Sequence, residues 1–183
     1  MSKLCAFFAP GFEECEGLLV VDILRRGGVD VTIAAVGADR MVTGSHKIAV
    51  QADALAQELD FSAFDAVFLP GGMPGTLHLK ENALVRRTAT EFAAAGKVVS
   101  AICAAPTVLA DLGLLKGLQA TCYPGFEKDM AGAETTGAEF VRQGNLLTGR
   151  ALGAAIPFGL ELLAMLEGEE KAAGIRAAIC YEH

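Results

Sequence analysis

The chain has 183 residues, of which 52% are hydrophobic, and its formal net charge is −7. This length suits one well-filled core, so we expect a single domain over residues 1–183. The acidic balance offers no basic patch for phosphates, and no apolar run approaches the roughly 18 residues of a membrane helix, so we expect neither a nucleic-acid nor a membrane partner.

The N-terminal residues run directly into a predicted strand without the pattern of a signal peptide, which predicts a cytoplasmic protein. The chain contains five cysteines without a CxxC pair, and only three histidines. These counts argue against a disulfide framework and against a zinc site. We therefore expect reduced thiols and no bound metal.

The first third of the chain alternates strands with a helix. Residues 4–9 are a continuous apolar run that ends at Pro10-Gly11, which is typical of a strand buried on both faces. From about residue 13 to residue 26 the apolar residues recur at helical spacing, with glutamates first and arginines last. A strand at 29–36 completes a parallel strand–helix–strand unit, which predicts a doubly wound α/β sheet.

The remaining two thirds continue this alternation. Residues 40–42 and 48–50 predict a hairpin outside the main sheet, with His46 solvated near its tip. Periodicity and turn signals predict the other elements. These are strands at 64–69, 98–102 and 118–123, helices at 82–95, 104–113, 155–166 and 170–178, and a hairpin formed by 139–143 and 146–149.

Three segments that could carry chemistry follow predicted strands, so they should meet at the carboxyl edge of the sheet. Glu16 follows the first strand, and Gly71-Gly72 could aim backbone N–H groups at a ligand. Cys103 lies at a sharp strand-to-helix turn, where the positive end of the helix favours the thiolate. Simpler explanations are helix-dipole electrostatics for the glutamates, a plain turn for the glycines and packing for the cysteine.

The same segments resemble the three signatures of the ThiJ/PfpI superfamily. They read APGFEECE at 9–16, VFLPGG at 67–72 and AICAAPT at 101–107. More narrowly, the chain is similar to the branch that contains the parkinsonism-associated protein deglycase and its small bacterial ThiJ/YajL-like relatives. The resemblance spans nearly the whole chain, and it implies a flavodoxin-like three-layer sandwich that acts as a homodimer without a cofactor.

The resemblance also implies roles for individual residues. Cys103 would be the nucleophile and a peroxide-sensitive thiol, and Glu16 a largely protonated acid hydrogen-bonded to its sulfur. A carboxyl group in an apolar pocket beside a thiolate is indeed kept neutral by desolvation and like-charge repulsion. The other expected contributors are the backbone donors Gly72 and Ala104, and the pocket or anion contacts Gly71, Arg26, Tyr123 and Arg150.

The chain departs from parts of this family in its histidines. Some members place a histidine near the cysteine, where this chain has Tyr123. We expect none of His46, His78 and His183 to be well placed, which argues against a Cys-His-Glu triad that hydrolyses amides. His46 falls where some relatives have arginine.

The leading hypothesis is a cofactor-independent cysteine enzyme. It would convert methylglyoxal to lactate, as a glyoxalase III does, or repair early glycation adducts, as a deglycase does. Cys103 would add to the aldehyde to form a hemithioacetal, and Glu16 would move a proton between adjacent carbons before hydrolysis. Two alternatives stay open, namely a redox sensor in which Cys103 is oxidised to a sulfinate and a chaperone-like dimer that needs no cysteine.

Overall fold

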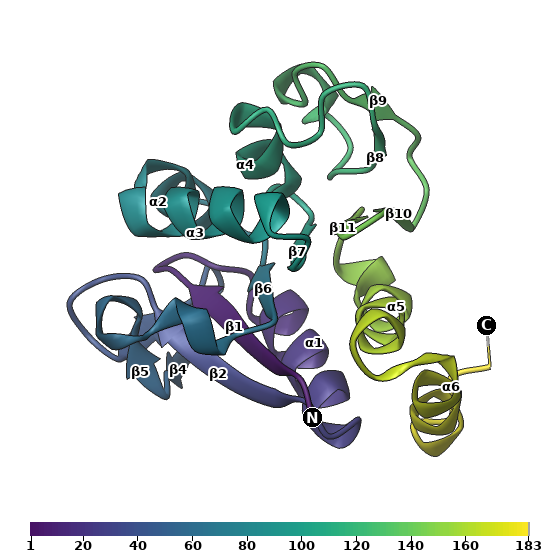
Figure 1. The fold of residues 1–183 in the computed structure, drawn as a ribbon. Coiled ribbons are helices and arrows are strands. Elements are labelled where there is room, and N and C mark those ends of the chain that lie inside the picture. The colour runs from purple at the N-terminus through teal and green to yellow at the C-terminus, as the bar shows by residue number, and fades with distance from the viewer. Residues whose placement is uncertain (183) are drawn as a thin grey trace.

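One seven-stranded sheet lies between two layers of helices in the computed structural model, which describes residues 1–182 (Figure 1). In chain order its strands are β1 (Lys3–Phe8), β2 (Asp30–Ala35), β5 (Ala54–Leu55), β6 (Ala66–Leu69), β7 (Val98–Ile102), β10 (Phe140–Gln143) and β11 (Leu146–Gly149). Their order in the sheet is β10-β11-β7-β6-β1-β2-β5, and β10 is antiparallel to β11 whereas the other neighbouring pairs are parallel. The mostly parallel α/β sandwich is thus confirmed.

Six α-helices and two small sheets complete the fold. The helices are α1 (Glu14–Arg26), α2 (Gly75–Glu81), α3 (Ala83–Ala94), α4 (Pro106–Asp111), α5 (Ala155–Glu167) and α6 (Glu169–Ala178). The small sheets pair β3 (Met41–Thr43) with β4 (Ala49–Gln51) and β8 (Gln119–Ala120) with β9 (Glu134–Thr135). Short 3₁₀ helices are η1 (Ala56–Glu58), η2 (Phe61–Ala63), η3 (Glu127–Asp129) and η4 (Leu152–Ala154).

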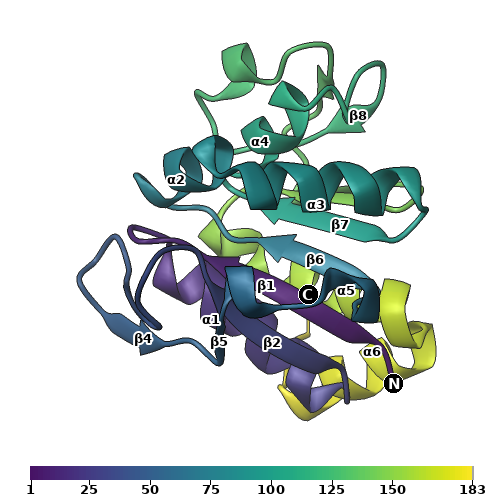
Figure 2. The ribbon, with the colours of Figure 1, turned by 60° about the vertical axis from the view of Figure 1, so that its left-hand side comes forward.

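Helices cover both faces of the sheet (Figure 2). The strands alternate their side chains between two apolar cores, one on each face. From β1, Leu4, Ala6 and Phe8 pack toward α1 and α5, whereas Cys5 and Phe7 pack toward the side covered by α3 and α4. Each of these five side chains is fully buried. Strand β1 is therefore held from both sides, and the loop that follows it has a fixed starting point.

Most predicted elements are confirmed, with three differences after residue 70. Helix α2 precedes the predicted helix, and Asn82 separates the two because its side chain accepts the N–H groups of Leu84 and Val85 and starts α3 anew. The helix after the cysteine is shorter than expected, spanning Pro106–Asp111. The predicted strand at 118–123 keeps only two strand residues outside the main sheet.

The predicted strand at 118–123 is short because its backbone N–H groups find partners outside a strand ladder. The N–H of Thr121 is donated to Thr148 Oγ1 at 3.0 Å, and the N–H of Tyr123 to the carbonyl of Cys103 at 2.7 Å. These bonds attach the segment to the end of the sheet instead of adding a strand to it. Among the helices of residues 1–182, none has the length and apolar character needed to cross a membrane.

Candidate active site

The sheet order brings the three sequence segments together. Strands β1, β6 and β7 are parallel neighbours in the order β7-β6-β1, so the loops at their carboxyl ends share one edge. The segments that follow these strands carry Glu16, in the first turn of α1, as well as Gly71-Gly72 and Cys103. The site is therefore built on the rigid centre of the fold, as is usual for open α/β sheets.

Cys103 occupies a strained bend directly after β7. Its φ of +65° lies in the left-handed region, which costs a residue with a Cβ on the order of 1–2 kcal/mol. Two backbone hydrogen bonds hold the bend, because the Cys103 N–H is donated to the carbonyl of Gly149 at 2.9 Å and its carbonyl accepts the N–H of Tyr123. The side chain is 9% exposed, and its sulfur accepts the N–H groups of Gly72 and Ala104.

Glu16 lies beside this sulfur in the first turn of α1. Its own N–H is held by the side chain of Glu13, the N-cap residue of the helix, at 2.6 Å. Its carboxylate accepts the N–H of Gly71 at 3.2 Å and the N–H of Leu152, and hydrogen-bonds the thiol of Cys103. Only 1% of this acidic residue is exposed.

Burial controls the protonation of this pair. It raises the pKa of Glu16 from 4.5 to about 7, against the hydrogen bonds from Cys103 and the backbone, which lower it. The direction is the expected one, although such a value leaves the carboxyl about half protonated at neutral pH. Burial, followed by the charge and hydrogen bond of Glu16, raises the pKa of the Cys103 thiol to about 12, whereas the N–H groups of Gly72 and Ala104 lower it.

The thiolate expected at a helix terminus stays a prediction, since burial and the neighbouring Glu16 raise the pKa of the thiol. Helix α4 begins at Pro106, three residues beyond the cysteine, and spans only six residues. The sulfur is also buried next to the carboxyl group of Glu16, which opposes a second negative charge there. Above about pH 7 the two groups share one negative charge and one proton, so they titrate as a pair rather than as two independent acids.

The two glycines are required by close packing at the site. A Cβ on Gly71 would lie 2.5 Å from both the Cβ of Cys103 and Oε2 of Glu16. Gly72 has a φ of +92°, and a Cβ there would collide with the backbone of Phe12 and Glu13. The loop after β6 can therefore approach the sulfur only because both positions lack a side chain.

A pocket of about 260 Å³ opens above the sulfur. It is lined by Glu13, Ser45, His46, Gly72, Met73, Cys103, Ala104, Tyr123 and Phe126. Tyr123 is 46% exposed and meets the ring of Phe126 edge-on at 6.1 Å between centroids. The predicted residues Cys103, Gly72, Ala104 and Tyr123 thus share one cavity, with Glu16 and Gly71 packed behind the sulfur.

Two of the predicted anion contacts lie elsewhere in the chain. Arg26 is at the opposite end of α1 from Glu16, where it pairs with Asp22 at 2.6 Å and borders a different hollow with Ile156. Arg150 is engaged beside β11, donating to the carbonyl of Gly137 at 3.0 Å. Neither arginine lines the Cys103 pocket.

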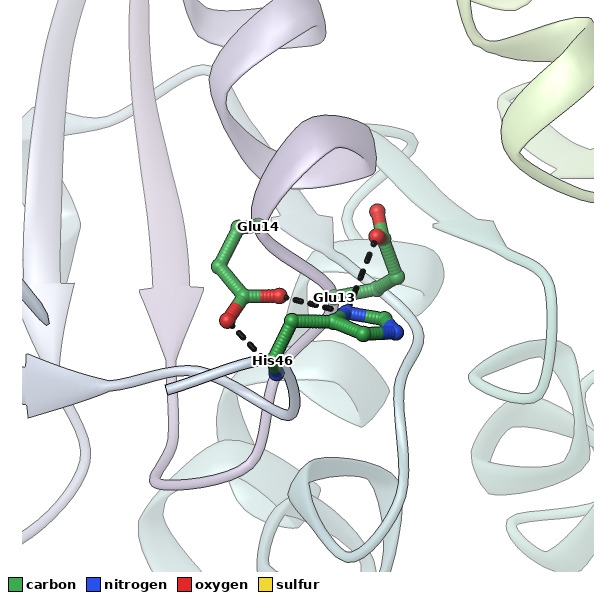
Figure 3. A group of neighbouring side chains, drawn as sticks. All are labelled: Glu13, Glu14 and His46. Atoms are coloured by element: carbon green, nitrogen blue, oxygen red, sulfur yellow. Dashed lines mark hydrogen bonds and ion pairs between the residues drawn. The ribbon is translucent and has the colours of Figure 1, made fainter. Parts of the chain in front are cut away.

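His46 corrects the prediction that none of the histidines is well placed. It lies in the turn between β3 and β4 and lines the pocket of Cys103. Its Nδ1 is 3.0 Å from Oε2 of Glu14 and 3.6 Å from Oε1 of Glu13 (Figure 3). By contrast, Nδ1 of His78 contacts the carbonyl of Pro10 at another hollow, and His183 lies outside the described residues.

The buried Glu14 explains how this turn is held. Its Oε1 accepts the N–H groups of His46 at 2.7 Å and Ile48 at 3.2 Å, and a Cβ on Gly44 would collide with its carboxylate. Burial raises the pKa of Glu14, but the hydrogen bonds from His46 and the backbone outweigh it and leave the pKa lowered. These bonds join residues that are more than 30 positions apart in the chain, so sequence periodicity could not reveal them.

Glu13, Glu14 and His46 are also residue types that bind metal ions, and one ligand atom of each lies within 4.8 Å of the others. Both oxygens of Glu14 already accept hydrogen bonds from the turn, and Nδ1 of His46 faces that carboxylate. The three residues therefore form a hydrogen-bonded cluster that positions the histidine.

The chain is similar to known proteins over most of its length. The model of the DJ-1/PfpI family matches residues 2–165. Protein dj-1beta of Drosophila melanogaster is 35% identical over 174 residues, which cover 93% of each chain. A Pyrococcus abyssi protein named a deglycase is 33% identical over 162 residues, or 87% of this chain and 96% of its own.

Two further comparisons show how much of each protein is similar. Protein DJ-1 homolog B of Arabidopsis thaliana is 37% identical over 166 residues, and the chain spans only 38% of that relative's length. The solved structure of oxidized Toxoplasma gondii DJ-1 superposes with a TM-score of 0.96 and 31% identity over the full length of both chains. The similarity therefore extends through the whole sheet and both helical layers.

Proposed function

Because this chain belongs to the DJ-1/PfpI family, we propose that it is a cofactor-independent cysteine enzyme acting on reactive 2-oxoaldehydes. Its reaction is the conversion of methylglyoxal to lactate, and early glycation adducts of the same aldehydes are the related substrate class. The name deglycase carried by the Pyrococcus abyssi relative supports this substrate class.

The observation that supports the proposal most strongly is the hydrogen bond between the buried Glu16 and the sulfur of Cys103. A carboxylate so close can take the thiol proton as the sulfur attacks, which removes the need for a free thiolate. The sulfur forms a bond to the aldehyde carbon, and the proton passes through Glu16 to the former carbonyl oxygen. The product is a hemithioacetal, and Glu16 is again a carboxylate.

The next step is an isomerisation within the bound substrate. Glu16 removes the hydrogen from the carbon bonded to sulfur and returns it to the neighbouring ketone carbon, while the hydroxyl proton moves from the first oxygen to the second. The result is a lactoyl thioester on Cys103. Water then attacks the thioester carbonyl, the carbon–sulfur bond breaks, and lactate leaves with the thiol restored.

Steady-state turnover of methylglyoxal by purified protein tests this proposal. We expect Cys103→Ala to abolish lactate formation, whereas Cys15→Ala, which removes an exposed thiol one residue from Glu16, leaves it unchanged. Equal turnover by wild type and Cys103→Ala would sink the proposal. Redox sensing and a chaperone-like role stay predictions, and aggregation suppression that survives Cys103→Ala would favour the latter.

The expected homodimer and cytoplasmic location are also predictions. Light scattering on the purified chain measures the former.

A further inference from the structure

The proposed reaction ends with hydrolysis of a thioester, and that step needs a base for the attacking water. Glu16 is poorly placed to activate a water from solvent, because it is only 1% exposed. Its carboxylate also accepts the N–H groups of Gly71 and Leu152, which hold it in place. Water reaches the acyl group from the open side of the pocket instead.

On that open side, His46 is the residue with a free basic nitrogen. Its side chain is 69% exposed and borders the same cavity as Cys103. Glu13, the other ionisable residue with an exposed edge there, is tied to the N–H of Glu16 through Oε2 and faces Nδ1 of His46 through Oε1. Tyr123 also lines this cavity, and its ring lies edge-on to Phe126.

The contacts of His46 set its tautomer. A carboxylate only accepts hydrogen bonds, so Nδ1, at 3.0 Å from Oε2 of Glu14, carries the proton in the neutral ring. Nε2 then holds a lone pair, and it points away from both carboxylates (Figure 3). A carboxylate that orients an imidazole in this way is the arrangement that makes histidine a general base in hydrolytic triads.

We propose that His46, oriented by Glu14, is the general base that activates water to hydrolyse acyl groups on Cys103. The inference rests on the thioester of the proposed function, and it assigns the hydrolytic step to a residue outside the Glu16–Cys103 pair. Nε2 takes a proton from water as the water oxygen bonds to the thioester carbon. The carbon–sulfur bond then breaks, the carboxylic acid leaves, and the proton returns to the sulfur.

Deacylation is measured directly by acetylating Cys103 with p-nitrophenyl acetate and following loss of the acetyl group by intact-mass spectrometry. This assay needs no aldehyde isomerisation, so it separates the inference from the substrate assignment. We expect His46→Gln to slow loss of the acetyl group roughly 100-fold, since a general base contributes about 10²–10⁴-fold. His78→Gln, which changes the histidine of another hollow, should deacylate at the wild-type rate.

With methylglyoxal, His46→Gln should form one lactoyl thioester per chain in a rapid burst and then turn over slowly. Free imidazole should restore hydrolysis in His46→Ala, which rules out a folding defect as the cause. Deacylation of His46→Gln within twofold of wild type overturns the inference. If wild type does not turn over methylglyoxal yet its deacylation depends on His46, the inference holds and the proposed substrate fails.

Discussion

Replacement of Glu16 by glutamine should change how stability depends on pH. The amide can still accept the N–H groups of Gly71 and Leu152, but it carries no charge. Burial raises the pKa of the carboxyl from 4.5 to about 7. Because the folded-state pKa is the higher one, the stability contributed by Glu16 is complete below about pH 4.5 and is lost as the pH rises through about 7.

The difference of about 2.5 pH units, at about 1.36 kcal/mol each, corresponds to about 3 kcal/mol. Urea unfolding at pH 4.5 and pH 8 measures it. We expect the stability of Glu16→Gln relative to wild type to increase by about 3 kcal/mol when the pH rises from 4.5 to 8.

Subtracting wild type cancels the titration of groups that do not interact with Glu16. Glu14→Gln is a control of opposite sign, since the pKa of Glu14 is lowered and its contribution disappears as the pH falls. A relative stability of Glu16→Gln that stays constant within about 1 kcal/mol would show that the acid is hydrated, and it would remove the physical basis of its catalytic role.

Two further predictions concern the same pair. Gly71→Ala should lower methylglyoxal turnover by more than tenfold, because its Cβ would displace Cys103 or Glu16. Gly174→Ala, where a Cβ meets open space, should leave turnover unchanged. Equal activity of the two variants would contradict the packing argument. Alkylation of Cys103 by iodoacetamide should accelerate as the pH rises through about 7, where Glu16 becomes a base, and Glu16→Gln should lose this step. A flat wild-type profile between pH 6 and 8 would show that the thiol reacts independently of the acid.

The elements that sequence alone predicted best are those with uninterrupted apolar runs. Strand β1 and helix α1 were expected within one or two residues of their observed limits, because burial on both faces leaves a continuous run and one buried helix face leaves a periodic one. The meeting of Glu16, Gly71 and Cys103 was also predictable, since parallel strands bring the loops after them to a common edge.

What the sequence could not reveal depends on contacts between distant segments. Leu152 donates its backbone N–H to Glu16. Almost any residue type has such a group, so the identity of residue 152 gives no signal. His46 reaches the pocket because Glu14 holds its turn, and nothing in the local pattern distinguishes it from a solvated hairpin residue. The raised thiol pKa likewise follows from burial, which neighbouring residues in the chain do not determine.

The small β3–β4 sheet has a consequence for how this protein could diversify. It contributes His46 and Ser45 to the entrance of the cavity, yet it shares no strand with the seven-stranded sheet that holds the nucleophile. Insertions or exchanges in this ribbon that keep His46 in place would remodel the entrance while the buried thiol and its acid stay in register. Substrate preference can therefore evolve in one module and bond-making chemistry be preserved in another.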